Sequence, residues 1–194
     1  MQKLKRRDLL SLEEYSDRRS HFRTKVLVHK TKRKVQLGDH MTLLFEDRLT
    51  MQYQVQEMLR IERLFEATAI QDELDAYNPL IPDGSNFKAT FMIEYVSSDE
   101  RKVALRRLIG VEDKVWLRVA AQERVFAVAD EDLERSDEDK TSAVHFLRFE
   151  LAADMCAAVK SGADIAIGID HEHCQATADP VPGAVRRSLA GDLD

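Results

Sequence analysis

The chain has 194 residues, of which 44% are hydrophobic and 33% are charged, and its formal net charge is −6. This composition is typical of a globular protein with one sizeable core, and it argues against a nucleic-acid-binding protein defined by bulk positive charge. No apolar run approaches the roughly 20 residues that span a bilayer, and two cysteines make no disulfide framework.

The first predicted element is a helix over residues 8–30, where apolar side chains recur at helical spacing. Basic residues crowd its second half and the segment after it: Arg18, Arg19, His21, Arg23, Lys25, Lys30, Lys32, Arg33 and Lys34. Such a run is typical of a solvated helix face, but it also suits phosphate or an acidic partner protein. If it binds a partner, we expect Arg23, Lys25 and Lys30 to make the contact.

Two short strands, Lys34–Leu37 and Thr42–Phe45, are predicted around the turn signal Gly38-Asp39, and they favour a hairpin. A later helical segment covers about Ile70–Tyr77. The loop of residues 78–86 that follows contains two prolines and Asp83-Gly84, so it is expected to be rigid. It is either a binding lip or a packed connection.

The helix predicted over Leu44–Phe65 is the centre of the expected fold. At about 100° per residue one face is apolar: Met51, Val55, Met58, Leu59, Ile61 and Phe65. Glu62 falls near the middle of that stripe, where a carboxylate has to be paired, protonated or facing a cavity. We expect Glu62 to be buried, bonded to an arginine or tyrosine, and more important for stability than Glu57, which lies off the stripe.

Two interpretations of this helix stay open. One is a structural ion pair, which perturbs the pKa of a carboxylate as strongly as a functional site does. The other is a ligand-binding or catalytic site, and its candidate residues are Tyr53, Arg60, Glu62 and Arg63.

The second half of the chain alternates strands with short helices. Strands are predicted at Phe87–Tyr95, Val115–Val119, Val125–Ala129, Thr141–Leu151 and Asp164–Asp170. Helices are predicted at Ser98–Ile109, at Ala152–Lys160 and after Pro182. We expect Trp116 and Phe126 to pack across a hairpin, His145 to share a strand face with Leu147 and Phe149, and the acidic run 130–139 to be a solvated connection.

The best metal candidate is the segment Asp170-His171-Glu172-His173-Cys174. If the strand continues through it, His171 and His173 share one face and can bind one ion, and Cys174 adds a ligand. Asp170 is an alternative ligand, and His145 from a neighbouring strand is a possible third nitrogen. The spacing matches no zinc module, so a solvated strand end remains the competing interpretation.

Three strings carry a family resemblance: LFEDRLTMQYQVQEMLRIERLFE at 44–66, ELDAYNPLIPDGSNFKATFMIEY at 73–95 and EDKTSAVHFLRFEL at 138–151. With them, almost the whole chain resembles the bacterial domain-of-unknown-function 3501 family. The resemblance implies no established activity. It implies a neighbourhood of genes for rubrerythrin-like proteins and for iron–sulfur proteins related to heterodisulfide reductase. In members of the family, the stretch that corresponds to DHEHC at 170–174 is closer to D-H-P-x-Y. His171 matches this pattern, whereas His173 and Cys174 do not.

These expectations combine into an α+β fold: a helical half, about residues 1–82, packed on a mostly antiparallel sheet from residues 83–194. We expect a single cytoplasmic domain, 1–194, without nucleic-acid or membrane partners. The leading hypothesis is a non-catalytic accessory or ligand-binding protein of a redox or iron–sulfur system. It has no cofactor of its own, because two cysteines cannot supply four thiolates to a cluster. The alternative is an enzyme, in one version metal-dependent, using the Glu62 or His171 region.

Overall fold

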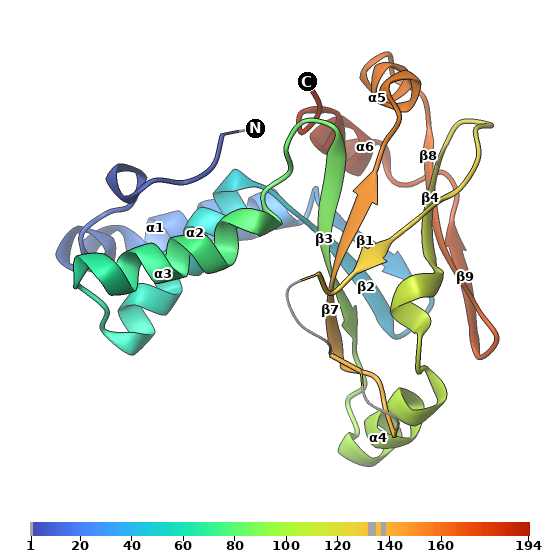
Figure 1. Ribbon diagram of the computed structural model, residues 1–194, viewed down its shortest axis with the longest axis horizontal. Helices are drawn as coiled ribbons and strands as arrows, with labels where there is room; N and C mark the ends of the chain where they lie inside the picture. The colour runs from blue at the N-terminus through green and yellow to red at the C-terminus, as the bar shows by residue number, and fades with distance from the viewer. Residues whose placement is uncertain (1, 132–134, 137–138) are drawn as a thin grey trace.

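The computed structural model describes residues 2–131, 135–136 and 139–194 (Figure 1). The helices are α1 (Leu12–Lys30), α2 (Arg48–Glu62), α3 (Ala67–Tyr77), α4 (Ser98–Arg107), α5 (Ala153–Lys160) and α6 (Gly183–Ala190). The strands are β1 (Lys34–Leu37), β2 (Met41–Glu46), β3 (Asn86–Ile93), β4 (Val115–Val119), β5 (Val125–Phe126), β6 (Val128–Ala129), β7 (Val144–Glu150), β8 (Ile165–His171) and β9 (Cys174–Ala178). Short 3₁₀ turns are η1 (Arg6–Asp8), η2 (Asn78–Leu80) and η3 (Val111–Lys114).

The strands form two antiparallel sheets, which confirms the predicted α+β class. The first sheet has the order β1-β2-β3-β7-β6 and the second has the order β5-β4-β8-β9. Alternate side chains of β3 point inward, as the pleat of a strand requires, so that Phe87 and Phe91 are buried. They share one apolar core with Leu117 of β4 and Ile167 of β8. The largest core of the protein therefore belongs to the sheets.

Helices α1, α2 and α3 lie together beside the sheets (Figure 1, blue to green). Helix α2 contacts both α1 and α3. A second apolar cluster holds them to each other and to the N-terminal segment, and it consists of Leu4, Met51, Val55, Leu59, Leu74 and Ile81. The N-terminal helical half thus has an apolar core of its own next to the first sheet.

Arg33 joins the helices to the sheets. Its side chain is 1% exposed, and its guanidinium donates to two main-chain carbonyls of β2 and to the carboxylate of Asp192 near the C-terminus. Asp47, which caps α2, lies 3.4 Å from the same guanidinium (Oδ2 to Nη1). His29 Nε2 lies 2.5 Å from Asp47 Oδ2. We call these four residues, Arg33, Asp47, Asp192 and His29, the joint network.

The predicted central helix starts later than expected. Residues 44–46 belong to β2, and α2 begins after the capping residue Asp47. It ends at Glu62, because Arg63 adopts a left-handed conformation with φ 56°. The side chains of Ile61 and Phe65, expected in the apolar stripe, are therefore exposed.

The expected strand 125–129 is divided between the two sheets. Strand β5 pairs with β4 and brings Phe126 opposite Trp116, which confirms the predicted cross-strand pair. Strand β6 pairs with β7 of the first sheet instead. A Cβ on Gly168 would clash with the indole ring of Trp116, so this position of β8 requires glycine.

Two connections can be compared with their expectations. The loop 78–86 is packed, because Ile81 and Pro82 are buried and Lys3 Nζ donates to the carbonyls of Asn78 and Ile81. In the acidic run, residues 132–134 and 137–138 lie outside the described part of the chain, whereas Asp130 turns inward. In the described part of the chain, no helix combines the length and apolarity needed to cross a membrane.

Candidate functional site

A cleft of about 800 Å³ opens where an edge of each sheet meets helix α4. The β1–β2 turn, α4 and the β8–β9 turn form its walls, and the edge strands β1 and β9 contact each other here. Its apolar lining comes from Leu37, Met41, Tyr95, Val103, Leu108 and Ala176. A preformed concave apolar site of this size is the default candidate for ligand binding.

Charged side chains surround this apolar lining. Asp39, Asp99 and Glu100 contribute three carboxylates, against the one guanidinium of Arg107. The His40 ring stacks on Tyr95 with 3.8 Å between the ring centroids. The excess of carboxylates, together with an aromatic face, favours a ligand that has an apolar body and a positive charge.

The predicted metal residues lie in the β8–β9 hairpin. The chain reverses at Glu172 and His173, so the strand does not continue through the segment, which was the condition for His171 and His173 to share a strand face. Their ring centroids lie 5.8 Å apart. The His171 ring is buried: Nε2 lies 3.1 Å from the carbonyl of Ile109, and Nδ1 accepts the N–H of His173 at 3.2 Å. Both nitrogens of His171 are thus engaged with the main chain.

His173 and Cys174 line the cleft instead. Burial raises the pKa of the Cys174 thiol, which keeps it neutral and weakens it as a nucleophile or a metal ligand. These two residues are therefore better suited to contacting a ligand than to catalysis or metal binding.

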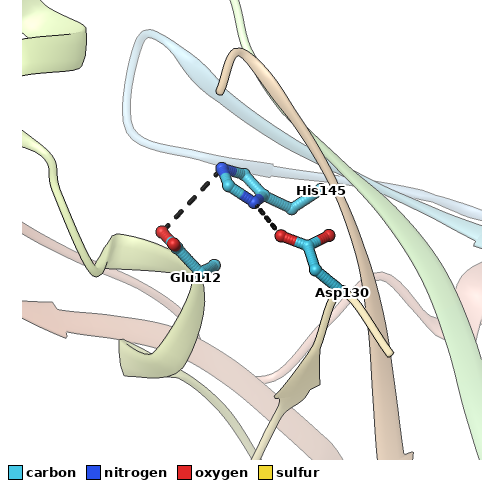
Figure 2. A group of neighbouring side chains, drawn as sticks. All are labelled: Glu112, Asp130 and His145. Atoms are coloured by element: carbon cyan, nitrogen blue, oxygen red, sulfur yellow. Dashed lines mark hydrogen bonds and ion pairs between the residues drawn. The ribbon is translucent and has the colours of Figure 1, made fainter. Parts of the chain in front are cut away.

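A second polar site is buried between the sheets and centres on His145 of β7, which is 0% exposed. Figure 2 shows Asp130 and Glu112 on opposite sides of the imidazole. His145 Nδ1 lies 2.5 Å from Asp130 Oδ2, and Nε2 lies 3.8 Å from Glu112 Oε2. Within residues 2–131, 135–136 and 139–194, these are the one group of at least three ligand-type side chains with donor atoms within 4.8 Å of one another.

The Nε2 side of the ring faces oxygen atoms. The Thr141 hydroxyl lies 2.9 Å from Nε2, and the carbonyl oxygen of Ser142 lies 3.1 Å from it. Glu112 accepts hydrogen bonds from Thr141 (3.1 Å) and from the Ser136 hydroxyl (2.5 Å). We call His145, Asp130, Glu112, Thr141 and Ser136 the His145 network.

The backbone around this network explains how the acids reach the histidine. Gly110, with φ 80°, follows the end of α4 by three residues and precedes η3, which carries Glu112 to the buried side. Asp130 has φ 47°, a left-handed conformation that aspartate tolerates better than most residues. Its Oδ1 accepts the N–H of Phe146 at 3.0 Å and lies 3.2 Å from Arg135 Nε. The inward face of His145 was predicted, whereas Glu112 and Asp130 were missed.

A family model described as Protein of unknown function (DUF3501) matches residues 3–193. This chain belongs to the DUF3501 family. The crystal structure of a novel protein of unknown function from Burkholderia pseudomallei K96243 is 52% identical, with a TM-score of 0.95 and 100% of both chains covered. No curated protein matches the chain. The relatives thus agree on the fold and assign no activity.

The four candidate ligand-binding residues of this DUF3501 chain are not among those that line the cleft. Glu62 is exposed, so its expected burial is wrong; it is the last residue of α2 and lies beyond the buried turns of the helix. Arg60 and Arg63 are also exposed, and Tyr53 is half-buried with its ring edge against Phe22.

The ion pair expected at Glu62 is formed by Glu57, one turn earlier. Glu57 accepts two hydrogen bonds from the Arg19 guanidinium, at 2.8 and 2.7 Å, and one from the Tyr15 hydroxyl at 2.6 Å. Arg19 and Tyr15 lower the pKa of Glu57 to about 2. Gln56, the fully buried polar residue of α2, bonds to the main chain of Leu10. The prediction placed the buried carboxylate at the residue where the helix ends.

The basic run is divided by the same helix packing. Arg19 and Arg33 point into the protein, where they bind carboxylates. Arg23 and Lys25 are exposed, and Lys30 is half-buried. The three predicted partner-binding cations are therefore accessible to different degrees.

Proposed function

We propose that this protein is a non-catalytic accessory protein whose cleft binds a peptide segment of a partner in a redox system. The observation that carries the proposal is the cleft itself, an apolar concavity with an excess of carboxylates. The family resemblance supports the redox setting. The partner is then an iron–sulfur protein related to heterodisulfide reductase or a rubrerythrin-like protein.

The chemistry of the cleft points to the kind of segment that it binds. Strand β9, the outermost strand of its sheet, lines the cleft through Cys174, Gln175 and Ala176. An extended peptide can pair with such an edge strand while its side chains enter neighbouring pockets. The carboxylates of the cleft favour a segment that carries a lysine or an arginine beside apolar side chains.

Binding of each recombinant partner to the purified protein tests the cleft, with a pair of matched variants. Val103 of α4 lines the cleft and is 52% exposed, whereas Val28 of α1 is 57% exposed on another helix. Val103→Asp is expected to weaken binding by about tenfold or more, because a buried valine contributes about 1.5–3 kcal/mol. Val28→Asp should leave the affinity within about twofold, since it does not touch the cleft.

The exposed cations of α1 form a second candidate contact for the same partner. Two residues apart on a helix, Arg23 and Lys25 point about 160° away from each other, so they cannot form one continuous patch. Reversing Arg23, Lys25 and Lys30 to glutamate together should slow association with an acidic partner, and the loss should shrink as salt is added. If the triple variant binds normally and Val103→Asp does not, the contact is the cleft alone.

The accessory role itself has a clear contradicting outcome. If neither partner binds at low salt, with all proteins folded, the proposal is wrong. The enzyme alternative then takes first place.

A further inference from the structure

The His145 network is independent of the cleft, and its geometry calls for a positive charge beside His145 Nε2. Three kinds of oxygen converge there: the Ser142 carbonyl at 3.1 Å, the Thr141 hydroxyl at 2.9 Å and the Glu112 carboxylate at 3.8 Å. A carbonyl oxygen cannot donate, and neither can an ionised carboxylate. The Thr141 hydroxyl has one proton to donate, and it donates to Glu112 at 3.1 Å. With that proton engaged, a neutral imidazole protonated on Nδ1 would turn its Nε2 lone pair toward the lone pairs of these oxygens.

The other ring nitrogen determines which tautomer is present. Nδ1 lies 2.5 Å from Asp130 Oδ2, and Asp130 is held in place by the N–H of Phe146 and by Arg135. The carboxylate accepts the Nδ1 proton, which leaves Nε2 as the free ligand atom. A carboxylate behind a histidine in this way is the usual outer support of a metal-binding imidazole, because it fixes the ring orientation and raises its basicity.

Charge leads to the same conclusion. Glu112 and Asp130 bring two carboxylates to His145, which is fully buried, and the Arg135 guanidinium lies 3.2 Å from Asp130. Buried carboxylates are strongly destabilising unless a positive charge lies close to them. A cation bound beside Glu112 would supply such a charge on the Nε2 side of the ring.

The spacing of the oxygens suits a cation. Ligand atoms bound at about 2.1 Å to one metal ion lie about 3.0–3.4 Å apart in octahedral or tetrahedral geometry. The distances from Nε2 to Thr141 and Ser142 and from Thr141 to Glu112 are 2.9, 3.1 and 3.1 Å. The distance from Nε2 to Glu112 Oε2 is 3.8 Å, longer than this range.

We infer that His145 Nε2, the Glu112 carboxylate, the Thr141 hydroxyl and the Ser142 carbonyl bind one divalent metal ion, with Asp130 orienting the imidazole. One nitrogen among oxygen ligands favours Mn²⁺, Fe²⁺ or Zn²⁺ over Ca²⁺ or a thiolate-bound metal. The ligands come from η3, from β7 and from the segment before it. The ion would hold these three parts of the chain together, as a closed structural site does.

The test is the metal content of the untagged full-length chain after exposure to Zn²⁺, Mn²⁺ or Co²⁺ and dialysis. We expect about one ion per chain, and with Co²⁺ a visible absorption band that carries a nitrogen-ligand signature. His145→Ala and Glu112→Gln should each abolish stoichiometric binding. Asp130→Asn should weaken it about 10–100-fold, as loss of an outer-shell carboxylate does.

Matched variants separate this site from the β8–β9 hairpin. His171→Ala removes the other buried histidine and should leave the metal content unchanged, as should His173→Ala combined with Cys174→Ser. If the hairpin variants lose the metal and His145→Ala retains it, the ion lies in the hairpin and the inference is wrong. If the unmodified chain binds none of the three ions, a proton supplies the positive charge and the inference is again wrong; this result does not depend on the folding of any variant.

Discussion

The joint network and the His145 network are both buried, and they differ in the residue at their centre. The joint network is centred on Arg33, whose guanidinium stays charged at every working pH. The His145 network is centred on an imidazole, which lies between the carboxylates of Asp130 and Glu112. The first network joins parts of the chain as distant as β2 and the C-terminal segment, whereas the second joins residues 112–145. Arg33 supplies its own positive charge to the carboxylates around it. In our inference, the His145 site gains its positive charge from a bound metal ion.

The largest loss of stability is expected from a substitution that breaks the joint network. Arg33→Met keeps the volume but leaves the carboxylates of Asp192 and Asp47 without their buried cation, so the free energy of unfolding should fall by about 3–5 kcal/mol. Urea unfolding measures this change. Arg23→Met, at an exposed position of α1, is the control and should change stability by less than about 0.5 kcal/mol. Equal unfolding midpoints for the two variants would mean that Arg33 does not carry the joint.

The pH dependence of the joint network is the next largest effect. Burial raises the pKa of Asp192 to about 6, although Arg33 acts in the opposite direction. Between its ordinary value of 3.8 and about 6, the folded chain holds a proton that the unfolded chain releases, so the contribution of Asp192 to stability falls as pH rises across this window. The change amounts to about 3 kcal/mol at about 1.4 kcal/mol per pH unit.

Asp192→Asn removes this titration, and the slope of stability against pH from 4 to 6 should become more positive than in the unmodified chain. Asp17→Asn, on the exposed surface of α1, should leave the slope unchanged. An identical slope for all three proteins would show that Asp192 titrates normally.

The two buried histidines sharpen the contrast between charged and neutral partners. His145 faces two carboxylates, whereas His171 bonds to a main-chain carbonyl and a main-chain N–H. His145→Gln should lower the free energy of unfolding by about 2–3 kcal/mol, and His171→Gln by about 1 kcal/mol, because bonds to charged groups are the stronger ones. Thermal unfolding of both variants at neutral pH measures the difference. If both variants lost the same free energy of unfolding, the bonds of His145 to carboxylates would be no stronger than the bonds of His171 to the main chain.

The smallest effect compares two carboxylates of α2. Glu57→Gln removes the ion pair with Arg19 and should lower stability by about 1–2 kcal/mol, whereas Glu62→Gln at the exposed helix end should change it by less than about 0.5 kcal/mol. Because the pKa of Glu57 is lowered to about 2, its contribution is present above pH 4.5 and is lost as pH falls toward 2. If Glu62→Gln is the more destabilising of the two, the helix is rotated relative to this description.

Local patterns predicted the elements well. Alternation located β3 and β7, a short apolar run located β8, and the Gly38-Asp39 turn signal located the β1–β2 hairpin. The same rules failed at Glu62, since the helix ends there and the apolar stripe drawn through Ile61 and Phe65 has no core to cover it. A helical wheel assumes that the helix continues, and it does not reveal where the neighbouring helix stops.

The candidate site was predicted only in part. Cys174 and His173 reach the cleft, but as wall residues and not as a set of metal ligands. Glu112 and Asp130 carried no spacing signal, because they lie 33 and 15 positions before His145 in the chain. Their convergence depends on the division of residues 125–129 between the sheets, which places Asp130 beside β7.

The sequence by itself determined the α+β class, the order of the elements up to β8 and the strand face that His145 shares with Leu147 and Phe149. These follow from the period of apolar residues and from turn chemistry. Strand β9 was not predicted. Only the tertiary structure decided which charges meet. Arg33 bonds to Asp192, which lies 159 positions away in the sequence, and Asp130 contacts His145, which lies 15 positions away. Electrostatic pairing depends on distance in space and on burial, and a linear pattern of residues contains neither.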